Sequence, residues 1–229
     1  MASTLTGISS MATRPLLADL TAAYRQRCDT AVAIESVGGV DAARRVEAGE
    51  AFDVVVLASD AIDKLLASGR VLGGSKVDLV RSGVAVAVRA GTPLPDLGSE
   101  AAVQRAVLAA RSIGYSTGPS GVALTRLFER WGIAEQIKGR IVQARPGVPV
   151  GALVASGEVE LGFQQLSELL PLGGITIVGP LPPAIQIETI FSAGVCAATT
   201  QPDAARALLE FLASPDAAET KRRHGMAPA

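Results

Sequence analysis

Short apolar runs alternate along this chain with segments in which apolar residues recur every three or four positions. The run Phe52–Leu57 is almost continuously apolar, which is typical of a strand buried on both faces of a parallel sheet. The segment 15–28 has helical spacing instead. Its apolar stripe consists of Leu16, Leu17, Leu20 and Tyr24. The pattern therefore predicts strands and helices in alternation.

The same two patterns predict the other elements, which are separated by turns rich in glycine, proline and serine. Strands are expected over 5–8, 31–36, 52–57, 82–88, 112–115, 160–163 and 175–178, and a long extended segment over 185–195. Helices are expected over 41–48, 60–68, 99–110, 122–131, 149–156, 165–170, 202–213 and 215–223.

Repeated strand–helix units in this order imply an α/β fold in which helices cover both faces of a mostly parallel sheet. Apolar strands cluster before about residue 80 and again from 112 to 178, so we expect two lobes. The expected lobes are residues 1–81 with 192–229, and residues 82–191. Two strands, near 83–90 and 186–195, would cross from one lobe to the other. Ligands in such folds bind outside the carboxyl ends of the strands.

Small polar residues stand at the carboxyl ends of the strands expected in the first lobe. They are Ser9 and Ser10 after the first strand, Gly38 and Gly39 after the second, and Ser59 after the third. Because a helix follows each turn, hydroxyls and free backbone N–H groups would stabilise an anion there. Serines here are also ordinary helix caps, although paired hydroxyls exceed what a cap requires. The glycines permit close backbone approach and positive φ.

A second group of candidates lies in the second lobe. It consists of Ser116, Thr117 and Ser120, interleaved with Gly118 and Gly121 before a helix. This composition is typical of a nest of backbone N–H groups that binds an anion. No Gly-Lys-Ser/Thr sequence follows, so the segment is not a P-loop.

Other candidates come from arginine and glutamine. Arg145 precedes a turn made rigid by two prolines, which also contains Val148, and an arginine fork commonly holds a carboxylate. Gln164 and Gln165 follow an apolar strand, and a glutamine pair suits a buried core poorly, so we expect them to face the cleft. Arg81, which opens the first crossover strand, is a candidate of the same kind, and Arg14 in the first helix is a weaker one.

Composition excludes several classes of protein. The chain has 229 residues, of which 48% are hydrophobic and 19% charged, so it can bury a substantial core. A net charge of −1 and 3% aromatic residues argue against a nucleic-acid partner. One histidine and two cysteines without metal spacing, Cys28 and Cys196, argue against a metal site or a histidine-based triad. We expect no cofactor and two unpaired, mostly inert thiols.

No segment approaches the roughly 20 apolar residues of a membrane span, so we expect no membrane insertion. The start, Met1–Thr4, leads directly into the first strand without a basic or apolar leader. As written, the sequence predicts a cytoplasmic protein. It predicts a periplasmic one if a leader was removed.

The order of these segments resembles the periplasmic molybdate-binding proteins, which are bacterial extracellular solute-binding proteins of type II fold. The motifs that carry the resemblance are the Ser9-Ser10 and Gly38-Gly39 turns, the run 52–59, and the segments 114–121 and 157–163. The resemblance covers nearly the whole chain. It implies two α/β lobes, joined by two crossover strands, that close over a ligand in the cleft between them.

The resemblance also implies ligand contacts. The family holds an oxyanion with a serine in each of the first two turns, backbone N–H groups of two later turns, and a tyrosine. These fall on Ser10, on Gly39, near Pro119 or Ser120, near Gly147 or Val148, and on Gln165. Glycine and glutamine thus replace a serine and the tyrosine, which enlarges the site and adds an amide. A small organic acid therefore fits better than molybdate or tungstate.

Three functions remain open at this stage. The first is a binding protein for a small anion or organic acid, with an ABC permease as partner if the protein is exported. The second is an isomerase of a small unsaturated polycarboxylate such as aconitate, as the resemblance implies for some relatives. Its base would be Tyr115 or Glu188. The third is a ligand sensor, which would need a partner chain to bind DNA because no helix-turn-helix precedes residue 5.

Overall fold

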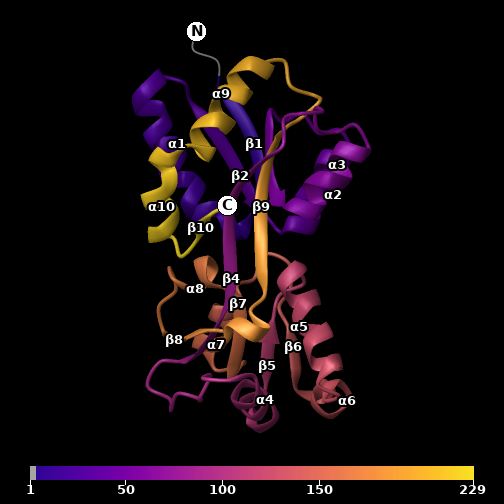
Figure 1. Cartoon of the computed structure of the whole chain (residues 1–229), viewed down its shortest axis with the longest axis vertical. Coiled ribbons are helices and arrows are strands. Elements are labelled where there is room, and N and C mark those ends of the chain that lie inside the picture. Colours follow the sequence, from indigo (N-terminus) through magenta and orange to yellow (C-terminus); the bar gives the residue numbers. More distant parts are fainter. Residues whose placement is uncertain (1–3) are drawn as a thin grey trace. The chain divides into compact units, whose positions relative to one another are not determined.

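The computed structural model describes residues 4–229 (Figure 1). Met1–Ser3, part of the start that was considered above for a leader, lie outside the described residues. The chain forms two compact units. Unit 1 comprises Met1–Ser82 and Ile190–Ala229, and unit 2 comprises Gly83–Thr189. Two strands, β4 (Val77–Arg89) and β9 (Glu188–Val195), contain the points at which the chain passes from one unit to the other.

Unit 1 is an α/β unit. Besides its parts of β4 and β9, its strands are β1 (Leu5–Ser10), β2 (Val32–Val37), β3 (Val54–Ala58) and β10 (Ala227–Pro228). Its helices are α1 (Arg14–Cys28), α2 (Gly39–Glu47), α3 (Ser59–Ala67), α9 (Pro202–Ala213) and α10 (Ala218–Arg223), with 3-10 turns η1 (Met11–Thr13) and η4 (Pro215–Ala217). β1 lies between β2 and β3, parallel to both, whereas β9 pairs antiparallel with β3.

The sheet of unit 1 is buried on both faces, as the apolar run of β3 predicts. Val54 and Val56 pack in one cluster with residues of α1 and α9, and Val55 and Leu57 pack in another with residues of α2 and α3. Figure 1 shows α1 and α10 on one side of these strands and α2 and α3 on the other. Alternate residues of one strand thus supply both layers of the core.

Unit 2 repeats this plan. Besides its parts of β4 and β9, its strands are β5 (Ile113–Tyr115), β6 (Ile141–Gln143), β7 (Leu161–Gln165) and β8 (Ile175–Pro180). Its helices are α4 (Glu100–Ala109), α5 (Pro119–Arg130), α6 (Ala134–Ile137), α7 (Val150–Ser156) and α8 (Leu166–Leu169), with 3-10 turns η2 (Lys138–Arg140) and η3 (Pro183–Ile185). β5 lies between β6 and β7, parallel to both, and β4 pairs antiparallel with β7 and β8.

The structure confirms the α/β alternation and corrects several details. Extended structure over the whole of 185–195 is wrong, because η3 occupies Pro183–Ile185 and β9 begins at Glu188. The single helix over 215–223 is divided into η4 and α10. The sequence analysis missed β6, which has only three residues, and the short helix α6. It also missed the first part of β4, where polar and apolar residues alternate.

Of the ionisable residues Lys221, Cys28 and Cys196, the first and last are buried and Cys28 is exposed. Lys221 lies in the basic run near the C-terminus, yet it is buried, and burial lowers the pKa of its amine. Cys28 is exposed at the end of α1. Cys196 is buried, and burial together with the nearby Asp53 carboxylate raises the pKa of its thiol to about 12. No described helix is long and apolar enough to cross a membrane.

Candidate anion-binding sites

The strand register in unit 1 places three predicted turns along one edge of its sheet. Ser9 lies opposite Ser36 of β2 and Val56 of β3, and Ser10 lies opposite Val37. Parallel strands that end in register bring their following turns together. The turns after β1, β2 and β3 therefore form one cluster of candidate residues, as the sequence predicts.

The two serines after β1 have different environments. Ser9 is fully buried, and its hydroxyl lies 2.7 Å from the Ser36 hydroxyl on the neighbouring strand. Ser10 is half-buried, and its hydroxyl accepts only a long hydrogen bond, 3.4 Å, from the Ala12 N–H. Ser9 therefore ties β1 to β2, whereas the Ser10 hydroxyl is the better placed of the two to exchange its partner for a ligand.

The glycines after β2 leave room for another group to approach the backbone closely, and their own backbone conformation is ordinary. Neither glycine uses the positive φ that the residue type permits: Gly38 caps α2 with φ −55°, and Gly39 is not among the residues with positive φ. A Cβ at Gly39 would lie 3.7 Å from the Ser10 hydroxyl oxygen, so these two predicted contacts are neighbours. Ser59, the third predicted contact, is half-buried as the first residue of α3.

The register in unit 2 produces a second cluster. Tyr115, the last residue of β5, lies opposite Gln143 of β6 and Phe163 of β7. The turn that follows, Ser116–Gly118, therefore lies at the same edge of the sheet as the ends of β6 and β7. Within it Ser116 and Gly118 are half-buried and Thr117 is exposed.

The start of α5 packs tightly against this turn. Gly118 is the helix cap, and its carbonyl accepts hydrogen bonds from the N–H groups of Gly121 and Val122. Ser120 is 5% exposed. A Cβ at Gly121 would overlap the carbonyl oxygen of Ser116, so only glycine allows the helix to start this close to the turn.

Arg145 and Val148 share a tight turn after β6. The Val148 N–H donates to the Arg145 carbonyl at 3.0 Å, and Gly147 has φ +79°, which indicates a type II turn with Pro146 in its favoured place. The Val148 N–H is therefore used within the turn. Arg145 is exposed, and its guanidinium has no hydrogen bond or ion pair with any residue that the structure describes.

The expectation that a glutamine pair avoids burial is wrong. Gln164 is 1% exposed and Gln165 is 3% exposed. The Gln164 side-chain oxygen accepts the Gly151 N–H at 3.2 Å, and the Gln165 amide donates to the Thr189 hydroxyl at 2.8 Å. Burial is tolerated because each amide has a hydrogen-bond partner.

Neither residue that the sequence suggests as a base is well suited to that role. Tyr115 is 8% exposed and packs in the core of unit 2, with its ring centroid 6.3 Å from that of Phe128. Glu188 is exposed at the start of β9.

Glu168 is the titratable residue that the sequence analysis missed. It lies in α8, directly after β7, and is half-buried. Burial raises the pKa of its carboxyl to about 7, against a weaker opposing effect of a hydrogen bond from Gln164. One signal could have revealed it: no other acidic or basic residue occurs between Glu160 and Glu188.

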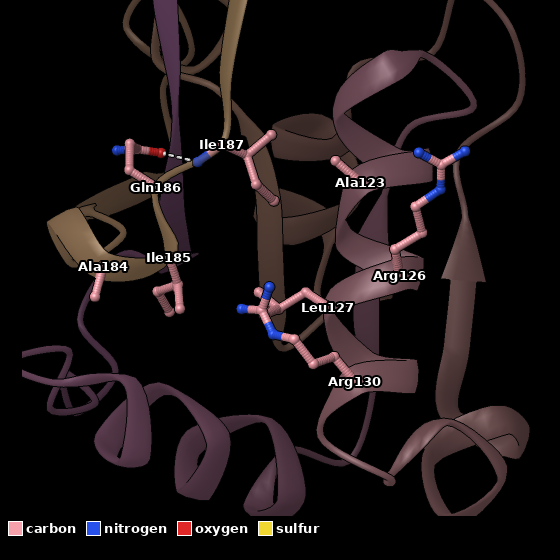
Figure 2. Close-up of a pocket in the computed structure, with 8 residues that line it drawn as sticks. All are labelled: Ala123, Arg126, Leu127, Arg130, Ala184, Ile185, Gln186 and Ile187. Carbon is pink, nitrogen blue, oxygen red and sulfur yellow. Dashed lines mark hydrogen bonds between the residues drawn. The ribbon is translucent and has the colours of Figure 1, made fainter.

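A pocket of about 250 Å³ in unit 2 lies away from the predicted residues. Figure 2 shows its walls, which are the second half of α5 and the segment 184–187. Leu127, Ile185 and Ile187 supply apolar surface, and Arg126 and Arg130 are exposed. The Gln186 side chain accepts the Ile187 N–H at 2.8 Å. None of the predicted contacts lines this pocket.

Within residues 4–229 no group of His, Cys, Asp or Glu side chains is arranged to hold a metal ion.

Comparison with known proteins decides the family. The model of the bacterial extracellular solute-binding protein family matches residues 5–227. The chain belongs to this family. The resemblance inferred from the turn motifs is thereby confirmed, and so is the type II fold of this solute-binding protein.

Solved structures share this fold. The periplasmic molybdate-binding protein of Azotobacter vinelandii matches with a TM-score of 0.80 and 22% identity, over 97% of this chain and 98% of that one. The sulfate-binding protein SubI of Mycobacterium tuberculosis matches with a TM-score of 0.80 and 17% identity, over 99% of this chain and 87% of that one. At such identities the likeness shows the fold of the solute-binding protein.

A curated relative is much closer in sequence. An aconitate isomerase from Pseudomonas sp. is 41% identical over 234 residues, which cover 98% of this solute-binding protein and 88% of the relative.

Proposed function

We propose that this solute-binding protein is an isomerase of a small unsaturated polycarboxylate, with aconitate as the first candidate. The observation that carries the proposal is the 41% identity to an aconitate isomerase along nearly the whole chain. This alternative from the sequence analysis has better support than the first function considered there, a binding protein for a small anion or organic acid. The replacement of a serine and a tyrosine of the molybdate-binding pattern by Gly39 and Gln165 agrees with it.

Each cluster holds donors of the kind that a carboxylate substrate needs. Aconitate carries three carboxylates, and a hydroxyl or backbone N–H hydrogen-bonds strongly to each. In unit 1 the proposed donors are the Ser10 hydroxyl and the N–H groups at the starts of α2 and α3. In unit 2 they are Ser116, Thr117, the start of α5 and the exposed Arg145. The hydroxyl and N–H donors carry no fixed charge and suit a negative charge that spreads over the substrate during reaction. Arg145 would add a full positive charge opposite one carboxylate.

The reaction is a proton shift between two carbons. A base removes a proton from the methylene group, and the charge spreads over the neighbouring double bond and carboxylate as a dienolate. Return of the proton at the former vinylic carbon moves the double bond. Hydrogen-bond donors aimed at the carboxylate oxygens stabilise this intermediate more than the substrate, which is what lowers the barrier.

The first experiment is a thermal-shift panel followed by NMR. Cis- and trans-aconitate should raise the melting temperature, because a ligand bound to the folded state stabilises it by mass action. Proton NMR of the same samples should show interconversion of the two isomers. Molybdate, tungstate and sulfate serve as controls and should give smaller shifts.

Two other outcomes have definite meanings. Stabilisation by carboxylates without interconversion would support a binding protein for organic acids, a function in keeping with the solute binding that the family description names. Stabilisation by molybdate or tungstate alone would contradict both the isomerase and the organic-acid binding protein. It would support transport of an oxyanion instead.

Removal of single hydroxyls should weaken the reaction. Ser10→Ala and Thr117→Ala are each expected to lower kcat/KM by at least about tenfold, since a hydrogen bond to a charged group contributes about 1.5–3 kcal/mol. Thr200→Ala, an exposed threonine in unit 1, is the control and should match the parent protein. Unchanged kinetics for both Ser10→Ala and Thr117→Ala would show that the donors lie elsewhere.

A further inference from the structure

Glu168 is a carboxyl group without a cation partner. Its helix α8 packs against β7 and α7, and no residue of either element is acidic or basic. The neighbouring strand β8 has no acidic or basic residue either. In the unit 2 part of β4 the one charged residue is Arg89, whose guanidinium lies beside Gly157, at the far end of α7 from Gly151. Within the described part of the chain, Glu168 makes no ion pair.

A buried amide holds this carboxyl in place. The oxygen of the Gln164 side chain is engaged by the Gly151 N–H at 3.2 Å, which leaves the NH₂ group of the same amide to donate to Glu168. Gln164 is 1% exposed, so both ends of the amide are fixed by packing. An amide donor orients a carboxylate without neutralising its charge, whereas an arginine would do both.

This arrangement has the properties of a proton acceptor. Burial disfavours the charged form more than Gln164 favours it, and the pKa of Glu168 therefore rises to about 7. A base works best when its pKa lies near the working pH, because it must be unprotonated yet still bind a proton strongly. Glu168 also lies in α8, the short helix that follows the carboxyl end of β7, where such folds place ligands.

We propose that Glu168 is the general base of the proton shift, an inference that rests on the proposed isomerase function. Its carboxylate removes a proton from the substrate methylene, and the electron pair of that C–H bond becomes the new carbon–carbon double bond. The pair of the old double bond moves to the former vinylic carbon, is spread over the attached carboxylate in the dienolate, and becomes the new C–H bond in the next step. The protonated Glu168 then delivers the proton to the former vinylic carbon. Atoms and electrons balance, and nothing is oxidised or reduced.

The test compares Glu168→Gln with the parent protein and with Glu129→Gln, which neutralises an exposed glutamate of the same unit. Glutamine at 168 keeps the size of the side chain but cannot accept the proton. We expect kcat to fall by about 10²- to 10⁴-fold, the usual contribution of a general base. Incorporation of solvent deuterium into aconitate, followed by NMR in D₂O, should fall in parallel. Glu129→Gln should retain parent activity and exchange.

The pH dependence supplies a second readout. The kcat/KM of the parent should rise with pH through about 7 and then level off, because the base must be unprotonated. Any residual kcat/KM of Glu168→Gln should not rise with pH through this range.

Stability shows whether the variant is intact. The pKa of Glu168 is about 7 in the folded protein and about 4.5 when unperturbed. The protonated carboxyl therefore favours folding at low pH, and this contribution is lost as the pH rises through 7. Glu168→Gln, which cannot ionise, should melt at or above the parent temperature at pH 8, and aconitate should still stabilise it.

The outcomes separate the two proposals. A Glu168→Gln protein with turnover within threefold of the parent would overturn the role of Glu168 and leave the isomerase intact. Loss of both turnover and aconitate-induced stabilisation would also overturn it, in favour of a binding or structural role. Absence of isomerisation by the parent protein itself would refute the proposed function.

Discussion

Gly121→Ala is expected to lower the free energy of unfolding by about 3 kcal/mol. Overpacking a well-packed site commonly costs about 1–3 kcal/mol. The upper end applies because the added methyl group would overlap the Ser116 carbonyl oxygen, which is backbone and cannot rotate away. For a chain of this size the melting temperature should fall by about 6–12 °C. Because Ser116 begins the unit 2 cluster, carboxylate-induced stabilisation should weaken as well.

Gly118→Ala is the matched control in the same turn. A Cβ there has its nearest neighbour, the Ser116 hydroxyl oxygen, at 3.7 Å, and the backbone φ of −75° suits alanine. Calorimetry or thermal denaturation of both variants measures the difference between their melting temperatures. Equal melting temperatures for the two variants would contradict the close approach of α5 to the turn.

Asp53→Ala should produce the second large loss, also about 3 kcal/mol. The Asp53 carboxylate is 6% exposed and accepts the Thr6 N–H at 2.7 Å, the Thr6 hydroxyl at 3.1 Å and the Thr199 hydroxyl at 2.5 Å. It therefore ties β1 to the turn after β9. Its removal leaves several donors without their acceptor, and hydrogen bonds to charged groups contribute about 1.5–3 kcal/mol each.

Urea denaturation of Asp53→Ala measures this loss directly. Asp60→Ala is the control, since Asp60 is exposed in the first turn of α3 and contributes at most about 1 kcal/mol there. A difference below about 1 kcal/mol between the two variants would mean that water replaces the carboxylate without loss.

Periodicity was a good guide to the elements with strong burial. α1 and β3 were predicted nearly to their ends, because one stripe of α1 and both faces of β3 are buried. β6 was missed because three residues are too few to show a period. The first part of β4 was missed because residues such as Asp78 and Arg81 interrupt its apolar pattern.

The position of the candidate turns at one edge of each sheet could be predicted, but not the hydrogen bonds that their side chains make. Parallel strands place the following turns at one edge whatever the side chains do. The bonds Ser9–Ser36 and Gln165–Thr189 join residues 27 and 24 positions apart, so they depend on strand register and packing. Glu168 was missed for the same reason: its basicity comes from burial between elements that have no charge of their own.

Cys28 is exposed and Cys196 is buried, so thiol labelling can mark the native protein and also follow its local unfolding. Thiol reagents attack the thiolate, so a maleimide dye at neutral pH should attach to Cys28 alone and mark the end of α1 without mutagenesis. Cys196 is hidden and its pKa is about 12, so it becomes reactive only when the surrounding part of unit 1 comes apart. The rate at which a second dye molecule attaches therefore measures the transient unfolding of this part of unit 1, and no mutation is needed.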